Sequence, residues 1–183
     1  FLLLIPAITM RSFAEEKKTG TIELLLTYPI NDTKIVLAKF FAALVLLVIS
    51  LLPTLIYFVS VYYLGYPKGN IDQGAMWGSY MGLVFLGAAF AAIGLFVSLI
   101  TDNQIIAFLF SVVICFIAWL GFDFVYSFDV FGSFGYFIKT LGISHHYESI
   151  SRGVVDTRDL VYFMSVIVLF LYVSVLRLKS RNW

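Results

Sequence analysis

Long apolar stretches separated by short polar segments form the dominant pattern of this sequence. Four such stretches run from about residues 35–64, 76–100, 105–126 and 160–176. A helix rises about 1.5 Å per residue, so about 20 apolar residues are needed to cross the roughly 30 Å of hydrocarbon in a bilayer. The pattern therefore predicts four membrane-spanning α-helices, the last of them near the short limit.

The chain opens on a further apolar stretch that is too short to span a membrane. Residues 1–9 read FLLLIPAIT, begin with Phe1 and end just before Met10 and Arg11. A signal peptide would carry positive charge before its apolar part and small residues at a cleavage site, and neither is visible. We interpret residues 1–9 as the end of a truncated span, which makes the chain the C-terminal part of a longer membrane protein.

Two of the predicted spans contain residues that indicate how they pack. In the span at 76–100, small residues recur at mostly four- and five-residue spacing, namely Gly78, Gly82, Gly87, Ala91 and Gly94. Small side chains let helix backbones approach closely in lipid, so we expect this helix to pack tightly against its neighbours. In the span at 35–64, Pro53 predicts a kink because it lacks a backbone N–H and clashes with the preceding turn.

The composition agrees with an integral membrane protein. Hydrophobic residues make up 61% of the chain and charged residues 13%, whereas a soluble domain is about half apolar and about a quarter charged. The net charge is +1, and the basic residues are spread over several loops. This distribution argues against a nucleic-acid partner, which would need clustered Lys and Arg.

Lys and Arg also predict the orientation, because cytoplasmic loops of membrane proteins carry an excess of them. With four spans, residues 10–33 and the tail at 177–183 fall on the same side. That side, with Lys39 in the first turns of the first span included, has eight Lys and Arg, and the other side has four. We therefore predict that both segments, and the turn at 101–104, lie in the cytoplasm. Residues 127–159 then form an extracytoplasmic segment, whose aromatic and glycine content suits short interfacial helices.

The polar segment at residues 10–33 holds the densest charge of the chain. Its first part, RSFAEEKKTG, ends in Gly20, which is expected to terminate a short helix. Its second part, TIELLLTY, is expected to form a short amphipathic element. Thr21 can cap that element, and Glu23 lies near its positive end.

The short amphipathic element has one apolar face. Ile22, Leu25 and Leu26 share that face at three- and four-residue spacing, and Pro29 ends the element. Eight residues are too few to cross a membrane. The element can therefore lie in the lipid interface or press into a groove on a partner protein, and the residues alone leave both alternatives open.

Two segments carry a resemblance to a known family. The segment MRSFAEEKKTGTIELLLTYPIND resembles the cytoplasmic loop between the second and third membrane helices of type-2 ABC exporter permeases. The matching positions are Met10, Arg11, Glu15, Glu16, Gly20, Thr21, Glu23, Leu25, Leu26 and Pro29. The segment YESISRGVVDTRDLVYF resembles the family's stretch before the last membrane helix, through Ser151, Arg152, Gly153, Asp156, Asp159 and Tyr162. The resemblance covers essentially the whole chain in helix order and is nearest to the permease subunit associated with gliding motility in Bacteroidota.

The resemblance implies an all-α polytopic helical bundle in the bacterial inner membrane. The family's elbow helix, its first span and most of its second have no counterpart in this sequence. The implied protein dimerises with a second permease copy or a paralogue, and each half sits on a cytoplasmic ABC ATP-binding subunit. That subunit would bind the ATP, since this chain has no G-x-x-x-x-G-K-[ST] motif and no cofactor site of its own is expected.

A coupling helix is the further implication of the resemblance. The short element in the polar loop would sit in a cleft of the ATP-binding subunit and pass its motion to the spans, between the limits set by Gly20 and Pro29. Ile22, Leu25 and Leu26 would supply the buried contact. The coupling residues are expected to be Glu15, Glu16, Gly20, Thr21, Ile22, Glu23, Leu25, Leu26 and Pro29. Among them, the acidic side chains are expected to pair with basic residues of the partner.

Two other function classes remain as alternatives. An intramembrane enzyme would need paired catalytic residues at matching depth, and the spans contain almost none. An ion-coupled carrier would need buried charges or interrupted helices near the midplane, for which Pro53 is thin support. Asp123 is either an interface carboxylate or a contact for leaving substrate. No catalytic site is predicted, because neither a G-x-S-x-G nor an H-E-x-x-H motif appears. No metal site is predicted, because the adjacent His145 and His146 would point about 100° apart on a helix. The sequence does not identify the substrate.

Overall fold

The computed structural model describes residues 1–23, 30–66, 72–127 and 133–180. Within these ranges the fold is helical and contains no strand. Four helices are long and apolar enough to cross a membrane: Asp32–Leu64, Gln73–Ile100, Gln104–Ser127 and Thr157–Lys179. The predicted all-α fold is confirmed, and each of the four helices overlaps one of the predicted apolar stretches.

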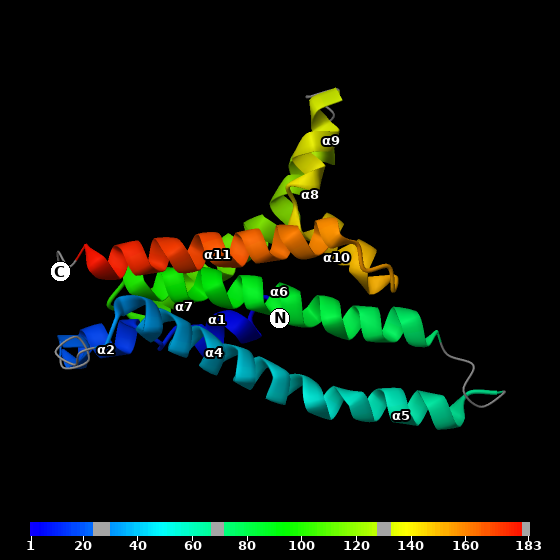
Figure 1. Cartoon of the computed structure of the whole chain (residues 1–183), viewed down its shortest axis with the longest axis horizontal. Coiled ribbons are helices and arrows are strands. Elements are labelled where there is room, and N and C mark those ends of the chain that lie inside the picture. Colours follow the sequence, from blue (N-terminus) through cyan, green and yellow to red (C-terminus); the bar gives the residue numbers. More distant parts are fainter. Residues whose placement is uncertain (24–29, 67–71, 128–132, 181–183) are drawn as a thin grey trace.

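Two short helices, α1 (Leu4–Thr9) and α2 (Ala14–Lys18), come first along the chain (Figure 1). The first membrane-length helix is composed of α4 (Asp32–Leu51), a 3-10 turn η1 (Leu52–Thr54) and α5 (Leu55–Leu64). The second is the uninterrupted α6 (Gln73–Ile100). The third is composed of α7 (Gln104–Phe116), a π-helical segment η2 (Ile117–Gly121) and α8 (Phe122–Ser127). The short helices α9 (Ser133–Thr140) and α10 (Ile143–Ser151) then lead to α11 (Thr157–Lys179).

Local sequence signals explain where these helices begin and bend. The carboxylate or amide oxygens of Asp72, Asn103 and Asp156 accept backbone N–H groups at the starts of α6, α7 and α11. Pro53 lies in the 3-10 turn that interrupts the first long helix, as its lack of an N–H predicts. Beyond that turn, α5 has no buried residue. The outer half of this long helix therefore adds little to the core of the chain.

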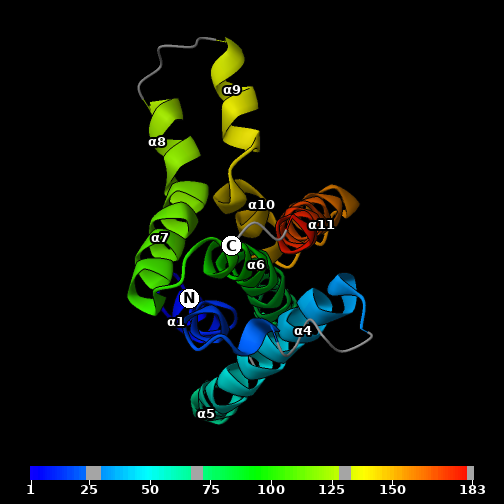
Figure 2. The ribbon, with the colours of Figure 1, turned by 90° about the vertical axis from the view of Figure 1, so that its left-hand side faces the viewer.

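Helix α6 is the centre of the bundle. Helices α1, α4, α7, α10 and α11 all pack against it (Figure 2). The small residues that the sequence singled out on α6 are all buried. A Cβ atom added at Gly87 would collide with Leu47 of α4, and one added at Gly94 would collide with Thr9 of α1. The predicted tight packing of this helix is confirmed.

The two ends of the bundle differ in what they contain. One end holds α2, the turn between α6 and α7, and the end of α11; we call it the α2 end (Figure 1). The opposite end holds α10 and the starts of α6 and α11, and we call it the α10 end. Helices α8 and α9 pack against each other and project from the side of the bundle (Figures 1 and 2).

Candidate functional site

The predicted coupling residues that the structure describes, those up to Glu23, lie at the α2 end. Glu15 and Glu16 belong to α2, and Thr19 and Gly20 follow its last residue. Gly20 has a φ of +72°, a left-handed conformation that glycine adopts without steric cost at the end of a helix. The expectation that Gly20 terminates a helix is confirmed. Leu25, Leu26 and Pro29 lie outside the described residues.

A serine from the central helix caps the start of α2. The Ser98 hydroxyl of α6 accepts hydrogen bonds from the backbone N–H groups of Phe13, at 2.8 Å, and of Ala14, at 3.1 Å. All three residues are fully buried. The first amides of a helix have no partner inside the helix, and Phe13 offers no side-chain acceptor of its own. A residue more than 80 positions away therefore supplies the cap.

Lys17 fastens the other end of α2 to α6. Its ammonium donates a 2.6 Å hydrogen bond to the carbonyl of Leu99 and lies 3.6 Å from a carboxylate oxygen of Asp102. The Leu99 carbonyl is one of the last four of α6, which have no partner within the helix, and a cation is favourable at that negative end. The Lys17 side chain is only 7% exposed. Burial lowers the pKa of Lys17, and the nearby Asp102 opposes that shift.

Lys39 of α4 holds α2 from a second side. Its ammonium donates hydrogen bonds of 2.5 Å to the carbonyl of Ser12 and to Oε1 of Glu16, and it lies 4.7 Å from the centre of the Phe13 ring. Oε2 of Glu16 is buried and has no hydrogen-bond partner among the described residues. Glu16 was expected to pair with a partner protein, whereas here it makes an ion pair within the chain.

The residues after Gly20 do not all face outward. Ile22 is 4% exposed and belongs to the core of the chain, so in this conformation its side chain is not available to a partner. The Thr21 hydroxyl lies 2.9 Å from the Thr19 hydroxyl and donates to the carbonyl of Glu16, which connects it to α2. Glu15 and Glu23 are exposed.

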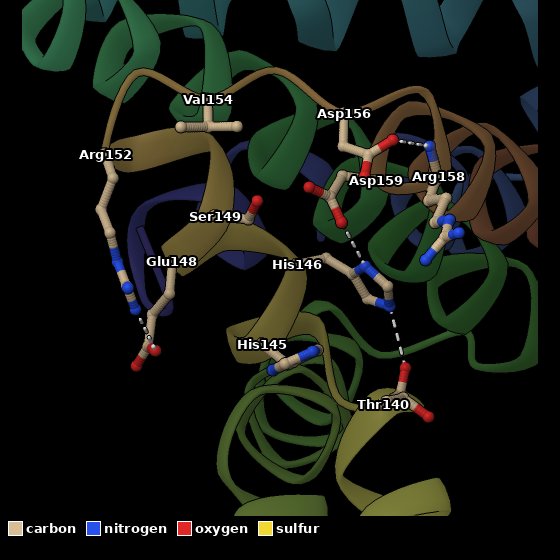
Figure 3. A pocket seen from close by; sticks show the side chains of 10 residues that line it. All are labelled: Thr140, His145, His146, Glu148, Ser149, Arg152, Val154, Asp156, Arg158 and Asp159. Atoms are coloured by element: carbon tan, nitrogen blue, oxygen red, sulfur yellow. Dashed lines mark hydrogen bonds and ion pairs between the residues drawn. The ribbon is translucent and has the colours of Figure 1, made fainter.

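A second polar cluster lies at the α10 end (Figure 3). His146 of α10 makes a 2.6 Å contact through Nδ1 with Oδ1 of Asp159 and a 2.8 Å contact through Nε2 with the carbonyl of Thr140. Its ring stacks on Tyr162 of α11 with the centroids 4.0 Å apart. Because a carbonyl can only accept, Nε2 must carry a hydrogen. The cluster joins α10 to the start of α11.

An open pocket of about 580 Å³ adjoins this cluster. Its side chains come from α10, from the start of α11 and from the segments beside them: Thr140, His145, His146, Glu148, Ser149, Arg152, Val154, Asp156, Arg158 and Asp159 (Figure 3). Asp123 of α8 lies outside the lining and accepts a hydrogen bond from Ser144. Asp123 therefore serves in the structure as a contact between helices.

The backbones of α6 and the segment after α10 come very close at the same end. Gly153 has a φ of +85°. A Cβ added at Gly78 would meet the Ile150 carbonyl and would lie 2.8 Å from Cα of Gly153. The Ser79 hydroxyl adds a 3.1 Å hydrogen bond to the carbonyl of Ser151. The second segment of the family resemblance thus includes the residues that lock the α10 end to the central helix.

A known protein family matches the chain over almost its whole length. Residues 2–183 match the family model described as ABC-2 family transporter protein. The chain belongs to the ABC-2 family. No curated protein matches it. As an ABC-2 protein it is a multi-pass membrane protein and a permease subunit of an ABC transporter, a class that generally works with an ATP-binding subunit.

Family membership confirms the resemblance to type-2 ABC exporter permeases at the level of the family. The α2 end of this ABC-2 chain holds the described part of the polar loop on which that resemblance rests. The residues that sequence reasoning missed there are Ser98, Lys17 and Lys39. Ser98 and Lys39 share a signal in the sequence, a polar side chain within two turns of the end of a predicted span.

Proposed function

We propose that this chain couples ATP hydrolysis by a separate ABC ATP-binding subunit to export across the bacterial inner membrane. The polar segment at residues 10–33 would be the contact with that subunit, on the cytoplasmic side. One observation carries the proposal: α2 is fastened to two different membrane-length helices, to α4 through Lys39 and to α6 through Ser98 and Lys17.

These attachments matter because force must reach the spans. A five-residue helix held only by its own flanking loops would yield when a partner pressed on it. Here the bonds to Ser98 and to the Leu99 carbonyl join both ends of α2 to α6, and the Glu16–Lys39 ion pair joins its middle to α4. Closure of the ATP-binding subunits would then displace α4 and α6 as packed bodies, which shifts the population between two arrangements of the bundle.

The remaining parts of the proposal rest on the sequence. The excess of Lys and Arg supports a cytoplasmic location for the segment at residues 10–33 and for the C-terminal tail. The resemblance supports a dimer of two permease copies or paralogues, and a role in secretion linked to gliding motility. The exposed Glu15 and Glu23 would meet basic residues of the ATP-binding subunit, and Leu25 with Leu26 would fill an apolar groove on it.

Co-purification tests this function directly. The full-length permease, expressed with the ATP-binding subunit from its own genome, is purified in detergent as the wild type and as Leu25→Asp plus Leu26→Asp. Val154→Asp plus Val155→Asp, a pair of exposed apolar residues at the α10 end, serves as the matched control. We expect the control and the wild type to retain the subunit and the leucine variant to lose it. Equal retention by all three proteins would refute the coupling assignment.

A further inference from the structure

The hydroxyl of Ser98 is the most specific link between the polar segment and the membrane bundle. A hydroxyl oxygen has two acceptor lone pairs, and the amides of Phe13 and Ala14 make two hydrogen bonds to this one atom. Ser98 lies near the C-terminal end of α6, half a turn before Ile100. The start of α2 is therefore fixed to one defined position on the central helix.

Burial makes this contact more than an ordinary cap. Ser98, Phe13 and Ala14 are all fully buried, so water does not reach the two amides if the hydroxyl is removed. The Lys17–Leu99 bond and the Lys39–Phe13 ring contact hold other parts of α2, but neither offers an acceptor to these amides. A buried amide without a partner is costly, so α2 would have to move or fray.

Helix α6 is also held closely at other positions. Gly94 lies against Thr9 of α1, and Gly78 lies against the backbone from Ile150 to Gly153. A displacement that enters α6 at Ser98 therefore meets closely packed neighbours along the whole helix, including the segment after α10. Close-packed contacts of this kind transmit movement and do not absorb it.

We infer that Ser98 is a positioning residue that locks α2 to α6, so that α2 and the central helix move as one rigid body. The inference rests on the proposed function for its role in transport, but the lock itself is a property of the permease. It can therefore be measured even where no ATP-binding subunit is bound.

Amide hydrogen exchange measures the lock at the two bonded groups. The full-length permease is reconstituted in lipid nanodiscs as the wild type, Ser98→Ala, Ser98→Thr and Ser111→Ala. Ser111 is the matched control, because it is a fully buried serine whose hydroxyl has no hydrogen-bond partner among the described residues. We expect exchange at Phe13 and Ala14 to accelerate by roughly 5- to 30-fold in Ser98→Ala only, with Ser98→Thr close to the wild type. Equal protection in Ser98→Ala and Ser111→Ala would overturn the inference.

A distance measurement tests whether the two helices move together. Spin labels are attached to Lys18→Cys, at the last residue of α2, and to Trp77→Cys, near the start of α6. Both native side chains are exposed, and the native Cys115 is buried. We expect one narrow distance distribution with Ser98 or Thr at position 98 and a broadened one with Ala. An equally narrow distribution in Ser98→Ala would overturn the inference even if hydrogen exchange had changed.

The same proteins separate this inference from the proposed function. Loss of the ATP-binding subunit from the Leu25→Asp plus Leu26→Asp variant bears on the function alone, since that variant keeps Ser98. If the wild type binds no ATP-binding subunit, the proposed function fails, while hydrogen exchange and the label distances still decide whether Ser98 locks α2 to α6.

Discussion

Replacing Gly78 by alanine is expected to destabilise the bundle more than the same replacement at Gly87. Both glycines are buried on α6, and at both positions an added Cβ collides with a neighbour. The neighbours differ in kind. At Gly78 they are backbone atoms, the Ile150 carbonyl and Gly153 with its Cα at 2.8 Å and N at 3.0 Å, whereas at Gly87 they are the terminal atoms of the Leu47 side chain.

The size of the destabilisation depends on whether the neighbouring atoms can move away from the added Cβ. Overpacking a close contact costs about 1–3 kcal/mol, and alanine is favoured over glycine within a helix by about 1 kcal/mol. At Gly87 the Leu47 side chain can change its rotamer, so the two terms are expected nearly to cancel. At Gly78 only a shift of the backbone after α10 relieves the collision. The cost should therefore lie at the upper end, with a net loss of about 2 kcal/mol.

Thermal unfolding of the two variants in the same detergent measures this difference. For a chain of this size, about 1 kcal/mol corresponds to a shift of about 2–4 °C in Tm. We therefore expect Gly78→Ala to unfold about 4–8 °C below Gly87→Ala, which should remain near the wild type. Equal Tm values for the two variants would show that α6 and the segment after α10 do not approach as closely as described.

Three further predictions concern the polar contacts. Lys39→Met leaves the Glu16 carboxylate without its cation and should lower the free energy of unfolding by about 1–3 kcal/mol, a loss that Glu16→Gln should partly restore in the same denaturation assay. Asp159→Ala removes the partner of His146 and should cost about 1–3 kcal/mol, with faster proteolysis between α10 and α11. Burial lowers the pKa of Lys17 below its ordinary 10.5, so the folded state disfavours the charged form. The free energy of unfolding should therefore rise as the pH increases through that lowered pKa toward 10.5, and Lys17→Met should abolish the rise.

The sequence predicts those parts of this fold that depend on single segments. The lengths of the apolar stretches indicate the four long helices, since the membrane sets a minimum length. The glycines of α6 identify the helix that packs most closely, because any side chain at these positions would collide with α1 or α4. Pro53 marks the interruption between α4 and α5 for an equally local reason.

Contacts between distant segments could not be predicted from the sequence. Nothing local links Ser98 to Phe13, because a serine near the end of a span is as well suited to facing headgroup water. The periodicity groups Ile22 on an apolar face, but it does not say whether that face meets a partner or the chain's own core. In the structure, Ile22 belongs to the chain's own core. The π-helical segment at Ile117–Gly121 and the projection of α8 and α9 likewise had no signal in the residue pattern.

The central position of α6 has a consequence for biogenesis. Thr9 and Leu47 leave the ribosome well before the glycines of α6 against which they pack. Helices α1 and α4 therefore enter the bilayer before α6, the helix against which they pack. They remain loosely associated until the chain has been translated to about Ile100. Arresting translation before that point should leave an intermediate that membrane proteases degrade, whereas arrest just beyond it should leave one that persists.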